Sequence, residues 1–308
     1  MKITVIGAGN VGASLAQRLI ERDFADIVML DIVEGLPQGK ALDILESAPI
    51  MNFAHGIIGT NRYEDTADSK IVVVTSGIAR KPGMTREELI KINAGIVADV
   101  VRRAAYHSPN CILITVANPV DALTYLAHKI SGFPRTRVFG LSGVLDSARL
   151  ATFISEELKV PVSDVSCYVL GEHGQNMVVL PRLAEVKGEP ITKLLRKGVI
   201  EHLVQRTVNG GAEIVSLLKT ASAFYAPSAS ITKMVLALAK NSGDIMPCAT
   251  YLEGEYGLRE VVMGVPVRLG RDGISEIIEL KFTPEEMRQF KTSAESVRQQ
   301  IASLPQQS

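Results

Sequence analysis

The sequence predicts an α/β protein in two parts: a parallel sheet covered by helices, then a domain of helices and shorter strands. The first half alternates short β-branched runs with helical periodicity, which is typical of βαβ units. Its strand candidates are continuously apolar, as expected of parallel strands that are buried on both faces. The chain has 308 residues, enough for two domains of about 150 residues each. We therefore expect one domain over residues 1–142 and another over 143–308.

The elements of the first half follow from this alternation. Strands are expected at 3–6, 27–30, 57–59, 71–75, 112–116 and 138–139, and helices at 11–21, 39–46, 86–106 and 119–129. The helix at 86–106 has a clear start signal, because Thr85 and Glu88 have capping-box spacing. That box places Arg86 in the first turn.

The second half predicts an α+β domain that begins near Ser142. The expected elements are helices at 145–158, 198–219 and 228–240, with strands at 165–170, 246–252 and 261–268. A last helix starts with the cap Thr283, a proline at its first position and Glu286 three residues after the cap.

Composition excludes several classes of partner. Lys plus Arg equals Asp plus Glu, 33 each, which argues against nucleic acid or an anionic membrane as the main partner. No apolar run is long enough to span a membrane, and a strand pattern at residue 2 leaves no room for a targeting segment. Cys111, Cys167 and Cys248 are far apart and lack CxxC spacing, so we expect reduced thiols, no metal site and a cytoplasmic location.

A glycine-rich turn predicts a dinucleotide site. The GxGxxG consists of Gly7, Ala8, Gly9, Asn10, Val11 and Gly12. It follows an apolar strand and opens a helix, which is the context that the motif requires. Its glycines permit a tight turn, close approach of a pyrophosphate and close helix–strand packing, and the helix N-terminus favours phosphate. We therefore predict a Rossmann domain, a doubly wound parallel sheet that binds a dinucleotide.

Asp31 predicts which dinucleotide binds. It ends the second strand, 19 residues after Gly12, where a carboxylate accepts the ribose hydroxyls and repels a 2′-phosphate. Ile32 and Val33 supply no cation for that phosphate, so NAD is favoured over NADP. The alternative is that Asp31 only caps a helix that starts near Glu34.

Two asparagines are further candidates at the same edge of the sheet. Asn93 falls inside the buried stripe of its helix and needs a hydrogen-bond partner, either structural or on the cofactor. Val116 and Asn118 end the fifth strand at its carboxyl edge, where ligands of open α/β sheets bind. Asn118 precedes Pro119 and could instead be only a helix cap.

His173 is the candidate acid or base. It follows an apolar strand and is flanked by glycines at 171 and 174, whereas the other four histidines lie among charged residues. Asp146 and Arg149 are three residues apart on one helix face. They form either a surface ion pair of little value or a functional pair, in which Asp146 orients a histidine and Arg149 grips a carboxylate. Periodicity leaves both interpretations open.

Arg80 and Arg86 lie on a Gly/Pro-punctuated segment between a strand and a helix. Arginine binds carboxylates through two parallel hydrogen bonds, so this segment suggests an enzyme that closes over a small dianion. Taken alone, such cations are more often simply solvated.

Together these motifs resemble the lactate/malate dehydrogenase family over essentially the whole length. The matching segments are 7–12, 31–35, 80–86, 117–121, 145–149 and 171–174, in the family's order and spacing. The resemblance implies reversible oxidation of (S)-malate to oxaloacetate by hydride transfer to NAD, a step of the tricarboxylic acid cycle, in a homodimer or homotetramer. The chain departs from the usual pattern at Ile78 and Ala79, where many relatives have a proline before the arginine.

The resemblance also implies roles for individual residues. His173 would exchange the substrate proton and Asp146 would orient it, while Arg149 would bind the C1 carboxylate. Arg86 would polarise the reacting carbonyl and Arg80 would pair with the second carboxylate. Asn118 would contact substrate and cofactor, and Asn93 the cofactor.

Residue 80 carries the choice of substrate, because lactate dehydrogenases typically have glutamine at the position of Arg80. The alternatives are a lactate or other 2-hydroxy-acid dehydrogenase and, from another class, a non-catalytic nicotinamide-binding regulator. The second would have to retain Asp146, Arg149 and His173 without using them.

Overall fold

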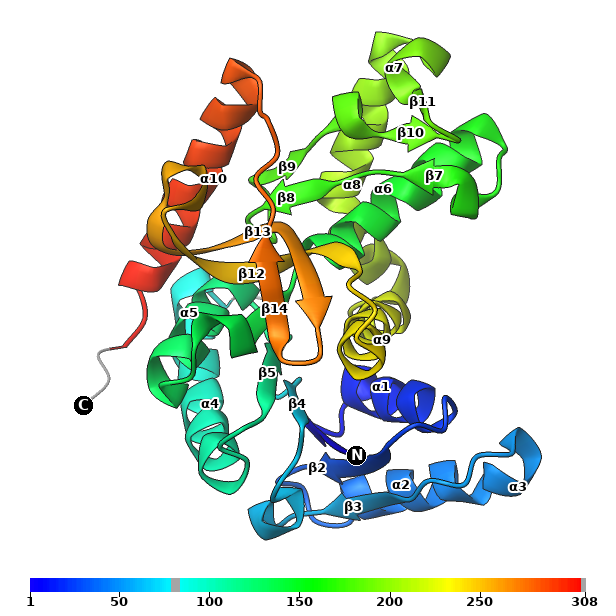
Figure 1. Cartoon of the computed structure of the whole chain (residues 1–308), viewed down its shortest axis with the longest axis vertical. Helices are drawn as coiled ribbons and strands as arrows, with labels where there is room; N and C mark the ends of the chain where they lie inside the picture. The colour runs from blue at the N-terminus through cyan, green and yellow to red at the C-terminus, as the bar shows by residue number, and fades with distance from the viewer. Residues whose placement is uncertain (79–83, 306–308) are drawn as a thin grey trace.

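The computed structural model describes residues 1–78 and 84–305 and confirms the predicted fold class (Figure 1). Its strands are β1 Lys2–Ile6, β2 Asp26–Leu30, β3 Ile57–Thr60, β4 Ile71–Val74, β5 Ile112–Thr115, β6 Val138–Leu141, β7 Val165–Ser166, β8 Val169–Gly171, β9 Met177–Val179, β10 Glu185–Val186, β11 Glu189–Pro190, β12 Ile245–Glu253, β13 Arg259–Gly270 and β14 Gly273–Ile277. Its α-helices are α1 Asn10–Ile20, α2 Leu36–Glu46, α3 Ala48–Met51, α4 Arg86–His107, α5 Val120–Ser131, α6 Gly143–Leu158, α7 Ile191–Leu194, α8 Lys197–Leu218, α9 Tyr225–Lys240 and α10 Pro284–Ala302. Short 3₁₀ helices lie at Tyr63–Thr66, Arg135–Arg137, Val162–Asp164, Pro181–Leu183 and Glu255–Gly257.

The first six strands form a parallel sheet in the order β3-β2-β1-β4-β5-β6. This is the doubly wound order of dinucleotide-binding folds, in which the strand order reverses next to β1. Ile6 at the end of β1 pairs with Leu30 of β2 and Val74 of β4. The carboxyl ends of these strands therefore lie together, at the crevice where ligands of such sheets bind.

The same sheet continues into the second half of the chain. β6 pairs antiparallel with β12, which is followed by β13, β8 and β9, while β14 pairs with β13. A small separate sheet has the order β11-β10-β7. Because the hydrogen-bonded ladder crosses residue 142, elements on both sides of it share one framework. The division at that residue stays a prediction.

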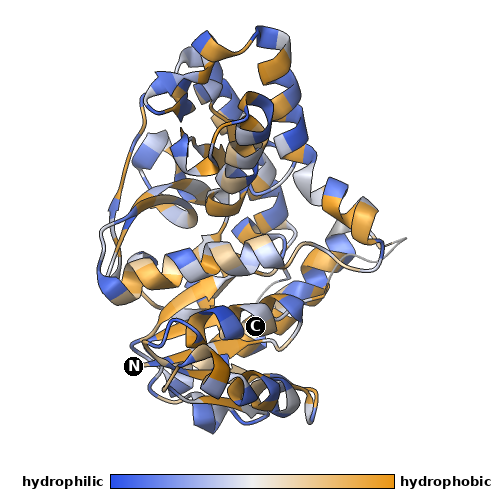
Figure 2. Cartoon of the chain, turned by 90° about the vertical axis from the view of Figure 1, so that its right-hand side faces the viewer, coloured by the Kyte–Doolittle hydropathy of each residue, from blue (hydrophilic) through white to orange (hydrophobic). Residues whose placement is uncertain are grey.

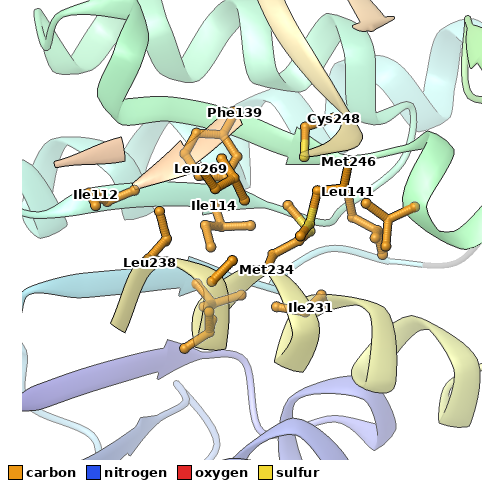
Figure 3. Packing of buried hydrophobic residues seen from close by; sticks show 14 of the residues in the cluster. Ile112, Ile114, Phe139, Leu141, Ile231, Met234, Leu238, Met246, Cys248 and Leu269 are labelled. Carbon is orange, nitrogen blue, oxygen red and sulfur yellow. The ribbon is translucent and has the colours of Figure 1, made fainter. Parts of the chain in front are cut away.

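Helices cover both faces of the parallel sheet. On one face α9 supplies Ile231, Met234 and Leu238, which lie against side chains from β5, β6 and β12 (Figure 3). On the other face α4 and α5 bury a second cluster against β1, β2, β4, β5 and β6. Figure 2 shows apolar strands enclosed between helices that carry both hydrophobic and hydrophilic residues. These buried apolar faces hold the strand ends in place.

The prediction of one strand over 165–170 was wrong. It divides into β7, in the small sheet, and β8, in the large one. Ser147 of α6 explains the break, because its carbonyl accepts from the Cys167 thiol and its hydroxyl accepts from the Val169 amide. These bonds to a helix replace strand partners and let the chain pass from one sheet to the other.

Several other boundaries differ from the prediction. α2 starts at Leu36 instead of residue 39, since Pro37 is accepted in the first turn of a helix. The short elements α3, β9, β10, β11 and β14 had no clear signal in the sequence. Both capping boxes are present, at Thr85 with Glu88 and at Thr283 with Glu286.

The last helix, α10, lies beside α5 and β13 (Figure 1). Its apolar side includes Phe290, Ala294 and Val297, which are fully buried. Within residues 1–78 and 84–305, no helix is both long and apolar enough to cross a membrane.

Candidate functional site

The glycine-rich turn after β1 is tightly built. Gly7 has a φ of +108°, which side-chain-bearing residues rarely adopt, and a Cβ on Gly12 would lie 1.8 Å from the Gly7 carbonyl oxygen. The Thr75 hydroxyl donates to the carbonyls of Ile6 and Gly7, at 3.1 and 3.0 Å. The turn therefore needs its glycines, and β4 supports it from the neighbouring strand.

This turn offers a cradle for phosphates. α1 begins at Asn10 with Gly9 as its N-cap and no side chain capping it, so its first amides have no partner within the helix. A Cβ on Gly9 would meet nothing within 4 Å, because that side of the turn is open. Gly7, Gly9 and Asp31 line a cavity of about 400 Å³. Free amides and a helix dipole facing open space suit a pyrophosphate.

Asp31 lies at the edge of this cavity. One carboxylate oxygen accepts from the Ala8 amide at 2.6 Å and the other from the Val33 amide at 3.0 Å. The alternative role as a helix cap is not found, since the N-cap of α2 is Gly35. Lys40 of α2 also reaches the turn, where its ammonium donates to the Ala8 carbonyl at 2.7 Å. The sequence prediction missed Lys40, whose distance from the glycines along the chain hides the contact.

Asn93 joins two segments at the strand ends. It is fully buried, and its amide nitrogen donates to the carbonyls of Asn118 and Ile78, at 2.7 and 3.1 Å. Its amide oxygen accepts from the Ile78 amide at 2.8 Å. Asn118 is exposed and follows Val116 at the end of β5, while the N-cap of α5 is Pro119. The contacts of Asn93 thus fix the backbone on which Asn118 stands.

Asp146, Arg149 and His173 form one hydrogen-bonded group. The Asp146 carboxylate accepts from His173 Nδ1 at 2.7 Å and from Arg149 Nη1 at 3.0 Å. The side chains of Asp146, Arg149 and His173 are 1%, 14% and 15% exposed. The interpretation of Asp146 and Arg149 as a surface pair is therefore wrong, because a buried carboxylate requires such partners.

One nitrogen of the Arg149 guanidinium bonds Asp146, and another is left without a partner in the described part of the chain. Among the residues that the structure describes, its buried Nε has no hydrogen-bond partner. Gly210 and Gly211 of α8 face the side chain, and a Cβ on Gly210 would lie 3.1 Å from Arg149 Cδ. A planar cation with a free donor beside an acid suits a bidentate carboxylate.

His173 is arranged to exchange a proton through Nε2. Asp146 accepts at Nδ1, which places the hydrogen of the neutral ring there and leaves Nε2 as an acceptor. Burial alone would lower the pKa of His173. The negative charge of Asp146, its hydrogen bond and the charge of Asp121 outweigh that effect and raise the pKa above its ordinary value.

A second cavity, of about 470 Å³, opens in front of His173. Asn118 and Glu172 line it, together with Ser296 and Gln300 of α10. Glu172 is held by Asn176 and Gln300 at 2.8 and 2.6 Å. A cavity of this size, with a histidine and an exposed amide in its wall, can hold a small organic acid.

Sequence reasoning missed several residues of this cavity. Gln300 is partly buried and lies seven residues, or about two turns, after the fully buried Ser293, so the helical pattern of the last segment contained a signal for it. Asp121 belongs to the matched segment 117–121 but was not singled out. Its partner is the backbone of His173, 52 residues away, which no local pattern indicates.

The structure does not describe the side chains of Arg80 and Arg86, the two arginines of the predicted closing segment. Arg80 lies outside the described residues, and so does most of that segment. Arg86 is the first residue of α4, but its side chain is outside what the structure describes.

Comparison with known protein families gives matches over both halves of the chain. Residues 1–140 match the lactate/malate dehydrogenase NAD-binding domain, and residues 143–307 match the lactate/malate dehydrogenase alpha/beta C-terminal domain. A malate dehydrogenase of Dehalococcoides mccartyi is 60% identical over 303 residues, covering 98% of this chain and 99% of that relative.

Solved structures of the same family superpose closely. Malate dehydrogenase from Salinibacter ruber has a TM-score of 0.95 and 45% identity, covering 98% of this chain and 97% of that one. A lactate dehydrogenase from Cryptosporidium parvum, complexed with lactic acid and nicotinamide adenine dinucleotide, has a TM-score of 0.94 and 36% identity, covering 98% and 96%. The fold alone thus does not distinguish the two activities, whereas sequence identity favours malate.

The glycine-rich turn generates a prediction about two alanine substitutions. Gly9→Ala places a methyl group in open space, so the free energy of unfolding should change by less than about 1 kcal/mol while NADH binding weakens at least about tenfold. Gly12→Ala forces the turn apart and should lower both NADH affinity and stability, the latter by about 1–3 kcal/mol. The chain has no tryptophan, so NADH fluorescence reports binding directly, beside a denaturant titration. Wild-type NADH affinity in Gly9→Ala would contradict the assignment of the cradle.

Proposed function

Because the chain belongs to the lactate/malate dehydrogenase family and carries out NAD-dependent oxidation of malate, we propose that His173 is the general base of this reaction. The observation that carries the proposal is the buried group in which Asp146 binds both His173 and Arg149. It joins a proton acceptor and a carboxylate-binding cation through one acid, and His173 lines a cavity of suitable size. Oxidation of a hydroxy acid requires both.

The residues around the glycine-rich turn fit NAD. The free amides at Gly9, Asn10 and Val11 would hold its pyrophosphate, and Asp31 would accept the ribose hydroxyls in place of its present backbone donors. NAD, when bound, supplies the acceptor for the hydride that leaves C2 of malate. Val116 and Asn118 stand at the strand end between this turn and His173. We propose that Asn118 contacts both ligands, and we retain Asn93 as a predicted cofactor-binding residue.

His173 takes the hydroxyl proton at Nε2 as malate is oxidised. The resulting imidazolium is stabilised by the Asp146 carboxylate, which holds Nδ1. In the reverse direction the protonated ring donates to the carbonyl oxygen of oxaloacetate. A raised pKa keeps His173 protonated to higher pH and so favours that direction near neutrality.

Arg149 binds the C1 carboxylate in this proposal. Its buried Nε has no hydrogen-bond partner among the described residues, and the absence of a side chain at Gly210 lets α8 pack closely against the Arg149 side chain. A guanidinium with an unused donor suits a carboxylate. From the family resemblance, Arg86 polarises the reacting carbonyl and Arg80 pairs with the second carboxylate.

We further propose that the chain forms a homodimer or homotetramer through α2 and α3. Leu42, Leu45 and Met51 are exposed on these helices, and Ile50 is 79% exposed. Such a cluster of apolar side chains on neighbouring helices is typical of a contact between subunits.

A cytoplasmic location is the last part of the proposal. Cys111, Cys167 and Cys248 are free thiols, which suits a reducing compartment. Burial raises the pKa of Cys111 and of Cys167 to about 12, so neither thiol is a reactive thiolate near neutral pH.

The role of His173 predicts a clean separation of binding from turnover. His173→Asn should lower kcat by about 10²- to 10⁴-fold, the usual contribution of a general base, with NADH affinity nearly unchanged. His202→Asn, at an exposed position of α8, is the matched control and should behave as wild type. NADH-oxidation assays with oxaloacetate and fluorescence titrations measure the two quantities. If NADH binding fell in step with turnover, His173 would instead be a structural residue.

The proposed role of Arg80 predicts that its replacement lowers activity on oxaloacetate far more than activity on pyruvate. Arg80→Gln should lower kcat/KM for oxaloacetate on the order of 10²-fold, which corresponds to a loss of a few kcal/mol of transition-state stabilisation. The kcat/KM for pyruvate should change far less. The reason is that only oxaloacetate has a second carboxylate to leave unpaired. Lys81→Gln removes a neighbouring charge and serves as the control. Equal effects on both substrates would exclude Arg80 as the discriminating residue.

The proposed subunit contact predicts the mass in solution. Light scattering coupled to gel filtration should give two or four times 33.2 kDa. Ile50→Asp should lower that mass without loss of folding, because the side chain is exposed within one chain. Tyr106→Asp, an exposed position at the end of α4, is the control. A monomeric wild-type protein would refute the contact.

A further inference from the structure

Asp121 is a buried acid that the mechanism above does not use. It lies in the first turn of α5 and is 1% exposed. One carboxylate oxygen accepts from the His173 backbone amide at 2.8 Å. The other oxygen is buried and has no partner among the residues that the structure describes. A buried acid in this state is costly, so its retention beside His173 requires an explanation.

Its position joins the two sides of the site. Asp121 stands three residues after Asn118, whose carbonyl is held by Asn93 of α4. His173 follows β8, in the other half of the chain. The bond from Asp121 therefore crosses from the first turn of α5, which follows β5, to the loop that carries His173.

The charges around His173 come from several elements. α6 contributes Asp146 and Arg149, both in contact with one another, and the loop of His173 itself contributes Glu172. Glu87 of α4 lines the same cavity, whereas α10 presents to it only uncharged side chains among the described residues. Asp121 and Asp146 are the two acids with a direct hydrogen bond to His173, one to its main chain and the other to its ring.

We propose that Asp121 is a positioning residue, which holds His173 by its backbone amide and stabilises the imidazolium as a second buried carboxylate. The inference rests on the proposed role of His173 as proton acceptor and deepens it. Asp146 alone would orient the ring. Asp121 adds a negative charge that acts on the ring from the main-chain side.

The electrostatics around Asp121 support this role. Burial raises its pKa to about 7, against the lowering effects of the His173 amide and the charge on the imidazolium. The charge of Asp121 in turn raises the pKa of His173. The acid and the imidazole thus titrate as a coupled pair.

The simpler alternative is that Asp121 only accepts a hydrogen bond. An asparagine at this position would do that equally well, because an amide oxygen of the same geometry accepts from the same N–H. The substitution Asp121→Asn therefore separates the two roles, since it removes the charge and keeps the acceptor.

The test is the pH dependence of kcat/KM in both directions. In wild type, kcat/KM for malate should rise, and that for oxaloacetate should fall, as His173 loses its proton. These pH-dependent parts of the two profiles are the rising limb for malate and the falling limb for oxaloacetate. In Asp121→Asn both limbs should move to lower pH by about 0.5–1 pH unit, because the imidazolium loses a stabilising charge. Oxaloacetate reduction on the falling limb should then drop about three- to tenfold. Asp164→Asn, which removes a carboxylate paired with Lys187 in the C-terminal half, is the charge control and should leave both limbs in place.

Each outcome bears on one proposal. If the pH profiles of Asp121→Asn and wild type had their limbs at the same pH, Asp121 would not stabilise the imidazolium by its charge, and the proposal would be overturned. Failure of both Asp121→Asn and Asp121→Ser to fold would also overturn it, by making the residue a determinant of stability. If His173→Asn instead kept its activity and the same pH dependence of kcat/KM, the proposed role of His173 as general base would be refuted. The two failures are thus distinguishable.

Discussion

The buried carboxylate of Asp146 is the constraint on which the site depends. It is almost fully buried, and it is stabilised by a histidine on one oxygen and an arginine on the other. Removing one partner of such a buried group typically costs about 3–5 kcal/mol, since the remaining charge is left uncompensated. Its place in the first turn of α6 adds a favourable interaction with the helix dipole. One acid therefore fixes both His173, the proposed proton acceptor, and Arg149, the cation proposed to bind the substrate.

The fold brings this acid to His173 by close backbone contacts. α6 begins at Gly143, directly after β6, and a Cβ there would lie 2.2 Å from the Val169 carbonyl oxygen. Gly171 at the end of β8 has a φ of +84°, and a Cβ on the facing Gly264 would lie 2.7 Å from its carbonyl oxygen. A larger residue at Gly143 would separate α6 from β8, and one at Gly264 would separate β13 from β8. The glycines thus determine whether Asp146 can reach the ring.

Local features of the sequence predicted most of the fold and part of the site. The glycine-rich turn, Asp31 and both capping boxes are encoded within a few residues, so pattern alone located them. The strand break at 167–168 depends on Ser147, and the anchor of His173 depends on Asp121, both distant along the chain. Periodicity also could not decide whether Asp146 and Arg149 were exposed. Burial is a property of what packs over a helix, which the helix's own sequence does not contain.

The connection through residues 118–121 has a consequence for how the two transfers are coordinated. In the proposed mechanism, hydride transfer requires substrate and cofactor at the strand ends, and proton transfer requires His173 on a loop of the other half. Asn93 fixes Asn118 by its carbonyl, and Asp121 fixes His173 by its amide. Because one short covalent segment holds both contacts, a shift of one is transmitted directly to the other. His173 therefore keeps its place relative to the strand ends where we propose that the cofactor binds, even though it belongs to a separate part of the chain.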